Sequence, residues 1–361
     1  MQYQHVTISR QGGSDVFEMV MDERPEPRAG EVGVRVLATG VAFTDVLIRE
    51  GLYPGLPKVP FTPGYEVVGI VDQLGPGVAG LDIGQRIAAL TVVGGYSEYI
   101  CLPEHECVSV PAEVDVAEAV GLVLQYVTAY QLLHRIAKVQ PGDLILIHGA
   151  AGGVGTALLE LGHLAGLKMY GTDSASKHDL IANLGATPID YQQQDFQQQI
   201  RRLTPNGMDV VFDAIGGRHL LGSYQTLAPG GQLISYGFSS ALSAQWGRLL
   251  IVGGSMGLLT LLNIWPDRRR AVFYNIADLK RRQPNWFRDD LMSLLDLLVD
   301  GSIQPIIADR LLLTDAAAAH DLLDHAAVRG QLVLLCNETF QANSSKPESK
   351  SLPVEHPSAL G

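Results

Sequence analysis

The feature that most constrains this chain is Leu144–Gly155, LILIHGAAGGVG, where branched apolar residues run directly into a glycine-rich turn and a helix-like segment follows. This order of strand, turn and helix is typical of a diphosphate-binding site. The diphosphate binds at the N-terminus of the helix, because free backbone N–H groups and the positive end of the helix dipole attract an anion there. Gly152 leaves room for the backbone to approach a pyrophosphate, and Gly155 lets the helix lie close to the strand. Ala150 replaces the first glycine of the usual fingerprint. A glycine turn used only for tight packing is therefore the alternative interpretation.

Length and charge restrict the class of protein. At 361 residues the chain exceeds one typical core, which predicts two domains. The formal net charge is −12 and basic runs such as Arg268–Arg270 are short, so nucleic acid and anionic membranes are not expected partners. Cys101, Cys107 and Cys336 lack metal-ligand spacing, and the N-terminal residues show no apolar signal core. We expect a cytoplasmic protein.

The order of segments predicts an α/β fold. Residues 1–120 read as mostly strand and turn, and from Gly142 strands and helices alternate about every 25 residues, which is typical of a doubly wound parallel sheet. The most apolar window, Leu249–Trp265, is 17 residues long, short for a membrane span. We interpret it as a pocket wall or an oligomer contact. The polar, proline-containing stretch Asn337–Gly361 is expected to be a disordered tail.

Four segments carry a resemblance to a known family: GVAFTDVLIREGLYP from Gly40, PGYEVVGIVDQLGPGV from Pro63, the glycine-rich segment from Gly142, and VRGQLVL from Val328. In this order they resemble the medium-chain dehydrogenase/reductase superfamily, and more narrowly its zinc-independent quinone oxidoreductase branch, including the synaptic vesicle membrane protein homologues. The resemblance implies a GroES-like β-rich catalytic domain at 1–122 and 272–337. It implies a Rossmann NADP(H)-binding domain at 123–271, an active-site cleft between the two, and a homodimer.

The resemblance also predicts that no zinc is bound. Zinc-dependent members supply a thiolate where this chain has Ala42 or Phe43, and a histidine where it has Tyr65 before Glu66. Zinc needs three or four converging N, S or O ligands, which these residues do not offer. Glu66 is then more simply a structural carboxylate.

Two residues are candidates for catalysis. Tyr53, in GLYP, matches a tyrosine that lines the substrate cleft of quinone reductases and donates a proton in related 2-enoyl reductases. A phenol has a pKa near 10 and so keeps its proton at neutral pH. The alternative for Tyr53 is a turn residue packed beside prolines. Asp45 matches a position next to the nicotinamide, but could equally cap the helix that begins there.

The choice of nucleotide depends on the end of the second Rossmann strand. Asp173 lies 18 residues after Gly155 and could accept the ribose 2′-OH of NADH. Ser174 and Lys177 suit the 2′-phosphate of NADPH, although Lys177 could be a solvated helix charge. Because the resembling branch uses NADPH, we expect NADPH, with NADH as the alternative. The full set of expected cofactor contacts is Thr128, Ala151, Gly152, Gly153, Val154, Gly155, Thr172, Asp173, Ser174, Lys177, Tyr191, Ile215, Tyr236, Gly237, Phe273, Tyr274 and Arg329.

These interpretations predict an oxidoreductase. It would reduce quinones or the C=C bond of α,β-unsaturated carbonyl or enoyl substrates by hydride transfer from NADPH, without zinc. The alternative is a nucleotide-binding trafficking or membrane-associated homologue with little turnover. A metal-dependent alcohol dehydrogenase is disfavoured by the missing ligands.

Overall fold

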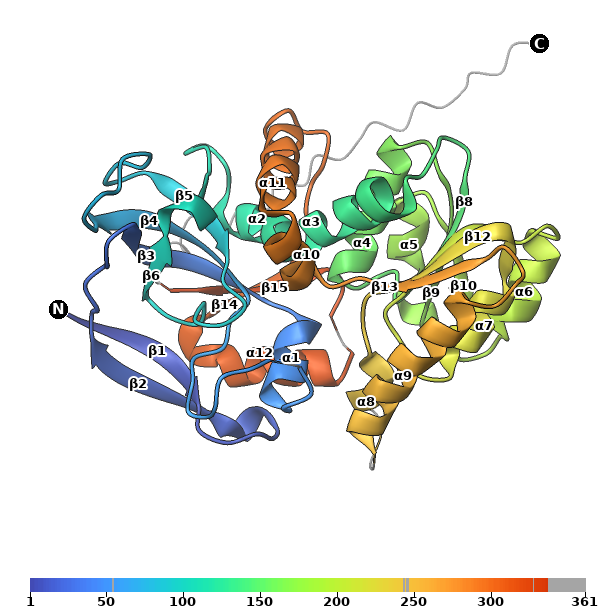
Figure 1. Ribbon diagram of the computed structural model, residues 1–361, viewed down its shortest axis with the longest axis horizontal. Coiled ribbons are helices and arrows are strands. Elements are labelled where there is room, and N and C mark those ends of the chain that lie inside the picture. The colour runs from blue at the N-terminus through green and yellow to red at the C-terminus, as the bar shows by residue number, and fades with distance from the viewer. Residues whose placement is uncertain (54, 243, 245–246, 327, 337–361) are drawn as a thin grey trace, which may run out of the picture.

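The computed structural model describes residues 1–336 except 54, 243, 245–246 and 327, so the predicted tail lies outside the described residues. Figure 1 shows a β-rich part on the left and a parallel sheet with helices on the right. The predicted fold class, a GroES-like β-rich domain joined to a Rossmann-type doubly wound sheet, is confirmed.

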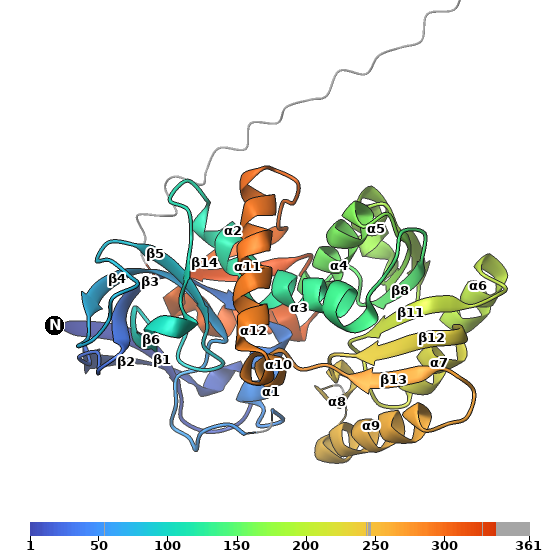
Figure 2. The ribbon, with the colours of Figure 1, turned by 45° about the horizontal axis from the view of Figure 1, so that its top comes forward.

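The right-hand part is built on six parallel strands in the order β10-β9-β8-β11-β12-β13, and Figure 2 shows β8, β11, β12 and β13 side by side. Their order reverses between β8 and β11, which is where ligands bind in open α/β sheets. The strands are β8 (Leu144–His148), β9 (Lys168–Asp173), β10 (Thr187–Asp190), β11 (Met208–Asp213), β12 (Leu227–Ser235) and β13 (Arg270–Phe273).

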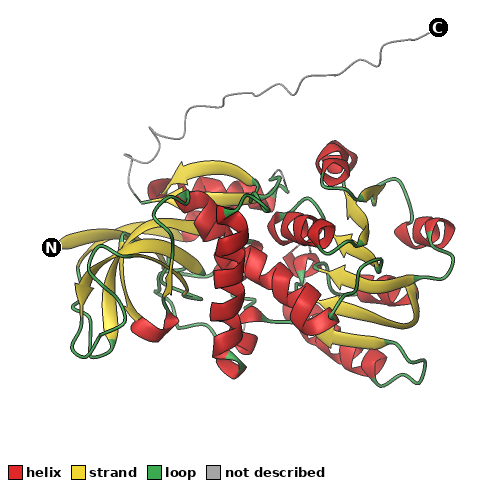
Figure 3. Cartoon of the chain, turned by 90° about the horizontal axis from the view of Figure 1, so that it is seen from above, coloured by secondary structure: helices red, strands yellow, loops and turns green. Residues whose placement is uncertain are grey.

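Both faces of this sheet are buried, because helices cover each of them (Figure 3). Ile145 and Ile147 of β8 pack in one core cluster with α4, whereas Leu146 packs in another with α6, α7 and α9. A continuous apolar strand is therefore required here, and LILI provides it. The helices are α4 (Gly153–Leu164), α5 (His178–Asn183, after the 3-10 turn η5, Ala175–Lys177), α6 (Phe196–Leu203), α7 (His219–Gln225), α8 (Ser239–Leu242) and α9 (Arg248–Asn263).

The β-rich part contains a mixed sheet of seven strands in the order β14-β15-β3-β4-β5-β7, with β6 paired to β3, and a separate β1–β2 hairpin. Its strands are β1 (Gln2–Ile8), β2 (Phe17–Glu23), β3 (Glu31–Val41), β4 (Glu66–Leu74), β5 (Arg86–Leu90), β6 (Tyr99–Pro103), β7 (Val108–Ser109), β14 (Ile307–Leu312) and β15 (Gln331–Leu335). Its helical elements are η1 (Ser14–Val16), α1 (Phe43–Arg49), η2 (Glu104–Glu106), η6 (Leu313–Asp315) and α12 (Ala316–Asp324).

The chain crosses between the two parts twice. The first crossing is the helical run Val116–Ala137, which comprises α2 (Val116–Gly121), a π-helical turn η3 (Leu122–Tyr126), α3 (Val127–Tyr130) and a second π-helical turn η4 (Gln131–Ala137). It is long and apolar enough to span a membrane, but 89% of its most apolar window is buried inside the protein, as in a core helix. The second crossing follows β13 into α10 (Ile276–Arg282) and α11 (Pro284–Val299).

Our predicted domain limits fall inside structural elements. The limit at 122/123 lies within the first crossing, and the limit at 271/272 lies within β13, all of which belongs to the parallel sheet. The segment after Gly237 contains α8 and α9, and the apolar window Leu249–Trp265 coincides largely with α9. Glycines at 253, 254 and 257 obscured the helical pattern, because they are poor helix formers.

Candidate functional site

A cavity of about 540 Å³ lies between the two parts, at the carboxyl ends of β8, β11 and β12. Its walls bring together segments that are far apart in sequence, including the glycine turn, α1 with the segment after it, and the segment after β13. Of the predicted site residues, eleven line it: Tyr53, Thr128, Gly152, Gly153, Val154, Gly155, Ile215, Tyr236, Gly237, Phe273 and Tyr274.

The glycine turn has the shape that the sequence suggests. A Cβ on Gly155 would lie 2.3 Å from the Gly149 carbonyl oxygen, and one on Gly153 would lie 1.8 Å from Gln125 Oε1. A Cβ on Gly152 would meet only the Gly149 carbonyl oxygen, at 3.4 Å, so the turn stays open above it. Close approach to backbone atoms explains Gly155, and α4 begins at Gly153 with its N-terminus toward the cavity. The turn therefore fits a diphosphate.

The end of β9 is organised around Asp173. Its carboxylate accepts hydrogen bonds from the backbone N–H of Ala151 at 3.1 Å and of Ser174 at 2.9 Å, and Lys177 Nζ lies 3.7 Å away. Both charged side chains are only about a tenth exposed. Asp173 and Lys177, which we treated as competing indicators of NADH and NADPH, are thus paired with each other. The carboxylate also holds the glycine turn against β9.

The remaining predicted contacts lie outside the cavity wall. Ala151 is fully buried and Tyr191 is 55% exposed. The Thr172 hydroxyl is hydrogen-bonded to His148 Nδ1 at 2.8 Å. Arg329 pairs with Asp179 at 2.9 Å and donates to the Ser176 carbonyl oxygen, beside Ser174. The structure therefore places Arg329 against the segment that follows β9. For these residues, contact with a nucleotide stays a prediction.

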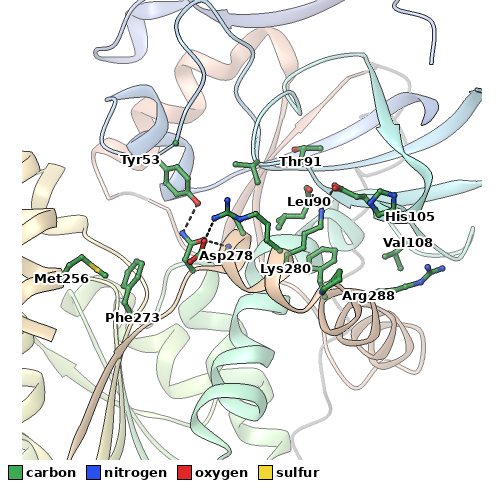
Figure 4. A pocket seen from close by; sticks show the side chains of 18 residues that line it. Tyr53, Leu90, Thr91, His105, Val108, Met256, Phe273, Asp278, Lys280 and Arg288 are labelled. Atoms are coloured by element: carbon green, nitrogen blue, oxygen red, sulfur yellow. Dashed lines mark hydrogen bonds and ion pairs between the residues drawn. The ribbon is translucent and has the colours of Figure 1, made fainter. Parts of the chain in front are cut away.

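Tyr53 lies at the centre of a small hydroxyl–amide network. Figure 4 shows Tyr53 with the dashed line that marks its hydrogen bond to the amide. Its hydroxyl oxygen is 2.6 Å from that of Tyr65, and Asn275 Nδ2 donates to it at 3.1 Å. The Asn275 Oδ1 atom accepts the Asp278 backbone N–H at 2.9 Å, which caps α10 and fixes which way the amide points. Burial raises the pKa of Tyr65 well above its ordinary value, so this phenol keeps its proton.

Two carboxyl groups are buried beneath this network. Asp45 is fully buried, accepts the Ala42 backbone N–H at 2.9 Å, and has an Oδ1 atom with no partner among the described residues. Burial raises the pKa of Asp45 to about 7. Glu66 accepts from the Leu124 backbone N–H and from Gln331, and burial raises its pKa as well. The position of Asp45 favours its capping of α1, and a catalytic role stays a prediction.

A second polar network supports the turn after β11. Asp213 Oδ1 accepts the backbone N–H groups of Ile215 and Gly216, while Oδ2 accepts from His219 at 2.9 Å and Ser223 at 2.6 Å. His148 completes it, 3.2 Å from Ser223. In the described part of the chain, His148, Asp213 and His219 form the one cluster of three converging metal-type ligands, and none of the three lines the cavity.

Sequence reasoning missed several residues of the site, among them Tyr65, Asn275 and Met256. Tyr65 was considered only as the replacement of a zinc ligand, Met256 only as part of an apolar window, and Asn275 was not among the expected contacts. All three line the cavity. Tyr65 and Asn275 meet Tyr53 across 12 and 222 residues of sequence, so no local pattern could reveal the network.

Comparisons with known proteins agree with this architecture. Residues 28–112 match an alcohol dehydrogenase GroES-like domain, and residues 184–334 match a zinc-binding dehydrogenase domain. The chain is similar to the synaptic vesicle membrane protein VAT-1 homolog of Rattus norvegicus, at 35% identity over 243 residues, or 67% of this chain and 58% of that protein. It therefore spans about three-fifths of the length of that relative.

Solved structures extend the likeness over nearly the whole chain. Pseudomonas syringae pv. tomato quinone oxidoreductase superposes with a TM-score of 0.81 at 30% identity, covering 92% of this chain and 99% of that one. Escherichia coli quinone oxidoreductase, solved in complex with NADPH, gives 0.83 at 26% identity with the same coverage. The chain belongs to the medium-chain dehydrogenase/reductase superfamily and, within it, to the zinc-independent quinone oxidoreductase branch.

Proposed function

We propose that this protein is an NADPH-dependent reductase that works without a metal and reduces quinones or the C=C bond of α,β-unsaturated carbonyl substrates. The observation that carries the proposal is the cavity itself. It has an open glycine turn at a helix N-terminus on one wall and the Tyr53 network on the other. The NADPH complex of the related Escherichia coli enzyme supports the choice of nucleotide.

The described residues fit this nucleotide. The backbone at Gly152 and Gly153 would receive the diphosphate, and Thr128, Tyr236 and Phe273 would enclose the nicotinamide side. Lys177, with Arg329 beyond it, would face a 2′-phosphate at the end of β9. When bound there, NADPH supplies the hydride, which goes to the electron-poor carbon of the acceptor.

The Tyr53 network would supply the proton. As the Tyr53 O–H proton moves to the acceptor, the phenolate oxygen keeps the hydrogen bond from Asn275 Nδ2 and gains one from Tyr65, whose own proton is held firmly by burial. Two donors aimed at the developing charge stabilise it in a largely apolar cleft. One hydride and one proton then complete the reduction, and Tyr53 is reprotonated from water.

The same cleft argues for metal-free chemistry. At the positions where zinc-dependent relatives carry ligands, this chain has Ala42, Phe43 and Tyr65, all of which line the cavity. None of these side chains ligates zinc in the usual donor sets. Polarisation of the acceptor would therefore come from hydrogen bonds.

The test is NADPH oxidation with but-3-en-2-one and with 1,4-benzoquinone. Tyr53→Phe is expected to lower kcat by roughly 10²-fold or more, as for loss of a general acid, with NADPH affinity unchanged. Tyr3→Phe, on β1 and outside the cavity wall, is the control. Asn275→Asp keeps the α10 cap but removes the N–H donor, so it should lower kcat while the protein stays folded. Full kcat in Tyr53→Phe would refute the assignment of the proton donor.

One observation favours the alternative of a nucleotide-binding, membrane-associated protein with little turnover. The outer face of α9 and the residues after it are apolar and exposed, with Leu250 at 80%, Ile264 at 71% and Trp265 at 64%. Sedimentation with phosphatidylserine vesicles, with and without NADPH, distinguishes the two. Vesicle binding without NADPH consumption on any enone or quinone would favour this alternative.

A further inference from the structure

A second cavity adjoins the first and is larger, at about 880 Å³. The two share Tyr53, Met256, Phe273 and Asn275, so the proposed reaction site continues past the Tyr53 hydroxyl into an outer chamber. Figure 4 shows this chamber as elongated, with Met256 and Phe273 at one end, Lys280 in the middle, and His105 and Arg288 at the other end. An acceptor larger than a small enone would extend in this direction.

Apolar side chains form part of the chamber wall, beside polar and charged ones. Leu90, Val108 and Phe287 present buried side chains from β5, β7 and α11. Lys280 ties these walls together, because its Nζ donates to the Leu90 carbonyl oxygen at 2.9 Å and to Glu106 at 2.8 Å. These two hydrogen bonds connect the walls, and the apolar side chains of the lining would contact a hydrocarbon chain.

The same wall contains a residue with a strained backbone conformation. Val92 lines the chamber and has a φ of 67°, which is a rare conformation for a β-branched residue. The Tyr65 carbonyl oxygen accepts hydrogen bonds from the backbone N–H groups of Thr91 at 2.9 Å and Val92 at 3.1 Å. Such strain persists where the surroundings impose it, typically at ligand sites. These two hydrogen bonds connect the chamber wall to Tyr65, whose hydroxyl group is hydrogen-bonded to that of Tyr53.

Of the positively charged side chains that line the chamber, the one at its far end has no ion pair with a described residue. Lys280 pairs with Glu106, and Arg281 pairs with Asp278. Arg288 lies in the first turns of α11 and forms no ion pair with any described residue. The lining therefore has a surplus positive charge, in a chain whose formal net charge is −12.

The outer chamber adjoins the proposed reaction site, has apolar side chains in its wall and has Arg288 at its far end. From this arrangement we infer that the chamber binds the tail of an elongated acceptor, an apolar chain that ends in an anionic group facing Arg288. The inference rests on the proposed function for what happens at the head of that acceptor. The tail site itself is a matter of binding and can be measured without turnover.

Binding of octanoate and of octan-1-ol to the NADPH-saturated full chain tests the tail site. Isothermal titration at pH 8 should show octanoate binding about fivefold more tightly, because one close ion pair near a surface contributes on the order of a factor of five. Arg288→Glu should abolish or reverse that preference, and Arg202→Glu, an exposed arginine on α6, should retain it. Equal binding of the two probes by the wild-type protein, or an unchanged preference in Arg288→Glu, would overturn the inference.

Kinetics then separate this inference from the proposed function. In a series of vinyl ketones with a terminal carboxylate, kcat/KM should rise with chain length, by at most about fourfold per buried methylene, and should exceed that of the matching methyl esters. Ala277→Phe, which narrows the chamber, should raise KM for the long ketones more than for but-3-en-2-one. Turnover of but-3-en-2-one without any gain from the tail would refute the tail site alone. Octanoate selectivity without turnover of any ketone would refute the proposed function alone.

Discussion

Replacing Asp45 with asparagine tests whether a buried carboxyl beneath the cleft limits the stability of this protein. Asp45 is fully buried, and burial raises its pKa from 3.8 to about 7. The folded state therefore holds this proton more tightly than the unfolded state does. Its contribution to stability is fully present below about pH 4 and is lost as the pH rises toward 7.

The size of the effect follows from the shift. A difference of about 3 pKa units, at ~1.4 kcal/mol per unit, corresponds to about 4 kcal/mol lost between pH 4 and pH 8. The amide introduced by Asp45→Asn would be neutral throughout, and its oxygen can still accept the Ala42 N–H. The free energy of unfolding of Asp45→Asn, relative to wild type, should therefore rise by about 4 kcal/mol over this pH range.

Urea unfolding followed by circular dichroism at several pH values measures this difference. Any cost of fitting the amide is independent of pH and cancels when the two ends of the range are compared. Asp82→Asn removes an exposed carboxylate from the same part of the molecule and serves as the control, with no such trend expected. A difference between Asp45→Asn and wild type that stays constant with pH would refute the reasoning.

Further predictions concern the nucleotide. Gly155→Ala should weaken NADPH binding by at least about tenfold in a fluorescence titration, because its Cβ would force backbone atoms of the turn apart. Gly257→Ala, which meets open space on α9, should not. Lys177→Ala should lower the preference for NADPH over NADH by about fivefold, and Asp173→Ala should raise it, since each removes one charge of the pair that we propose faces the 2′ position. Tighter binding of NADH than of NADPH by the wild-type protein would contradict the choice of nucleotide.

Local patterns were sufficient for much of the fold. The LILI strand, the glycine turn and the helix after it could be predicted because each depends on neighbours in sequence. The spacing of parallel strands then implied where the site would lie. The helix α9 escaped prediction because its three exposed glycines conceal the helical period.

The chemistry of the site was less accessible from sequence. Asp173 and Lys177 could be identified as charges at the right position, but only the fold shows that they pair with each other. Likewise, Tyr53 could be predicted from the resemblance, whereas its partners Tyr65 and Asn275 come from the approach to β4 and from the segment after β13. Pairings of this kind depend on how the two parts of the molecule meet.

The most direct test of the central claim is NADPH oxidation with but-3-en-2-one by protein that has been treated with a chelator and shown to be free of zinc. The account predicts that the saturated ketone forms at the rate of untreated protein, because the described cleft residues offer hydrogen-bond donors in place of a metal. Loss of turnover on chelation, with recovery when zinc is added back, would contradict it.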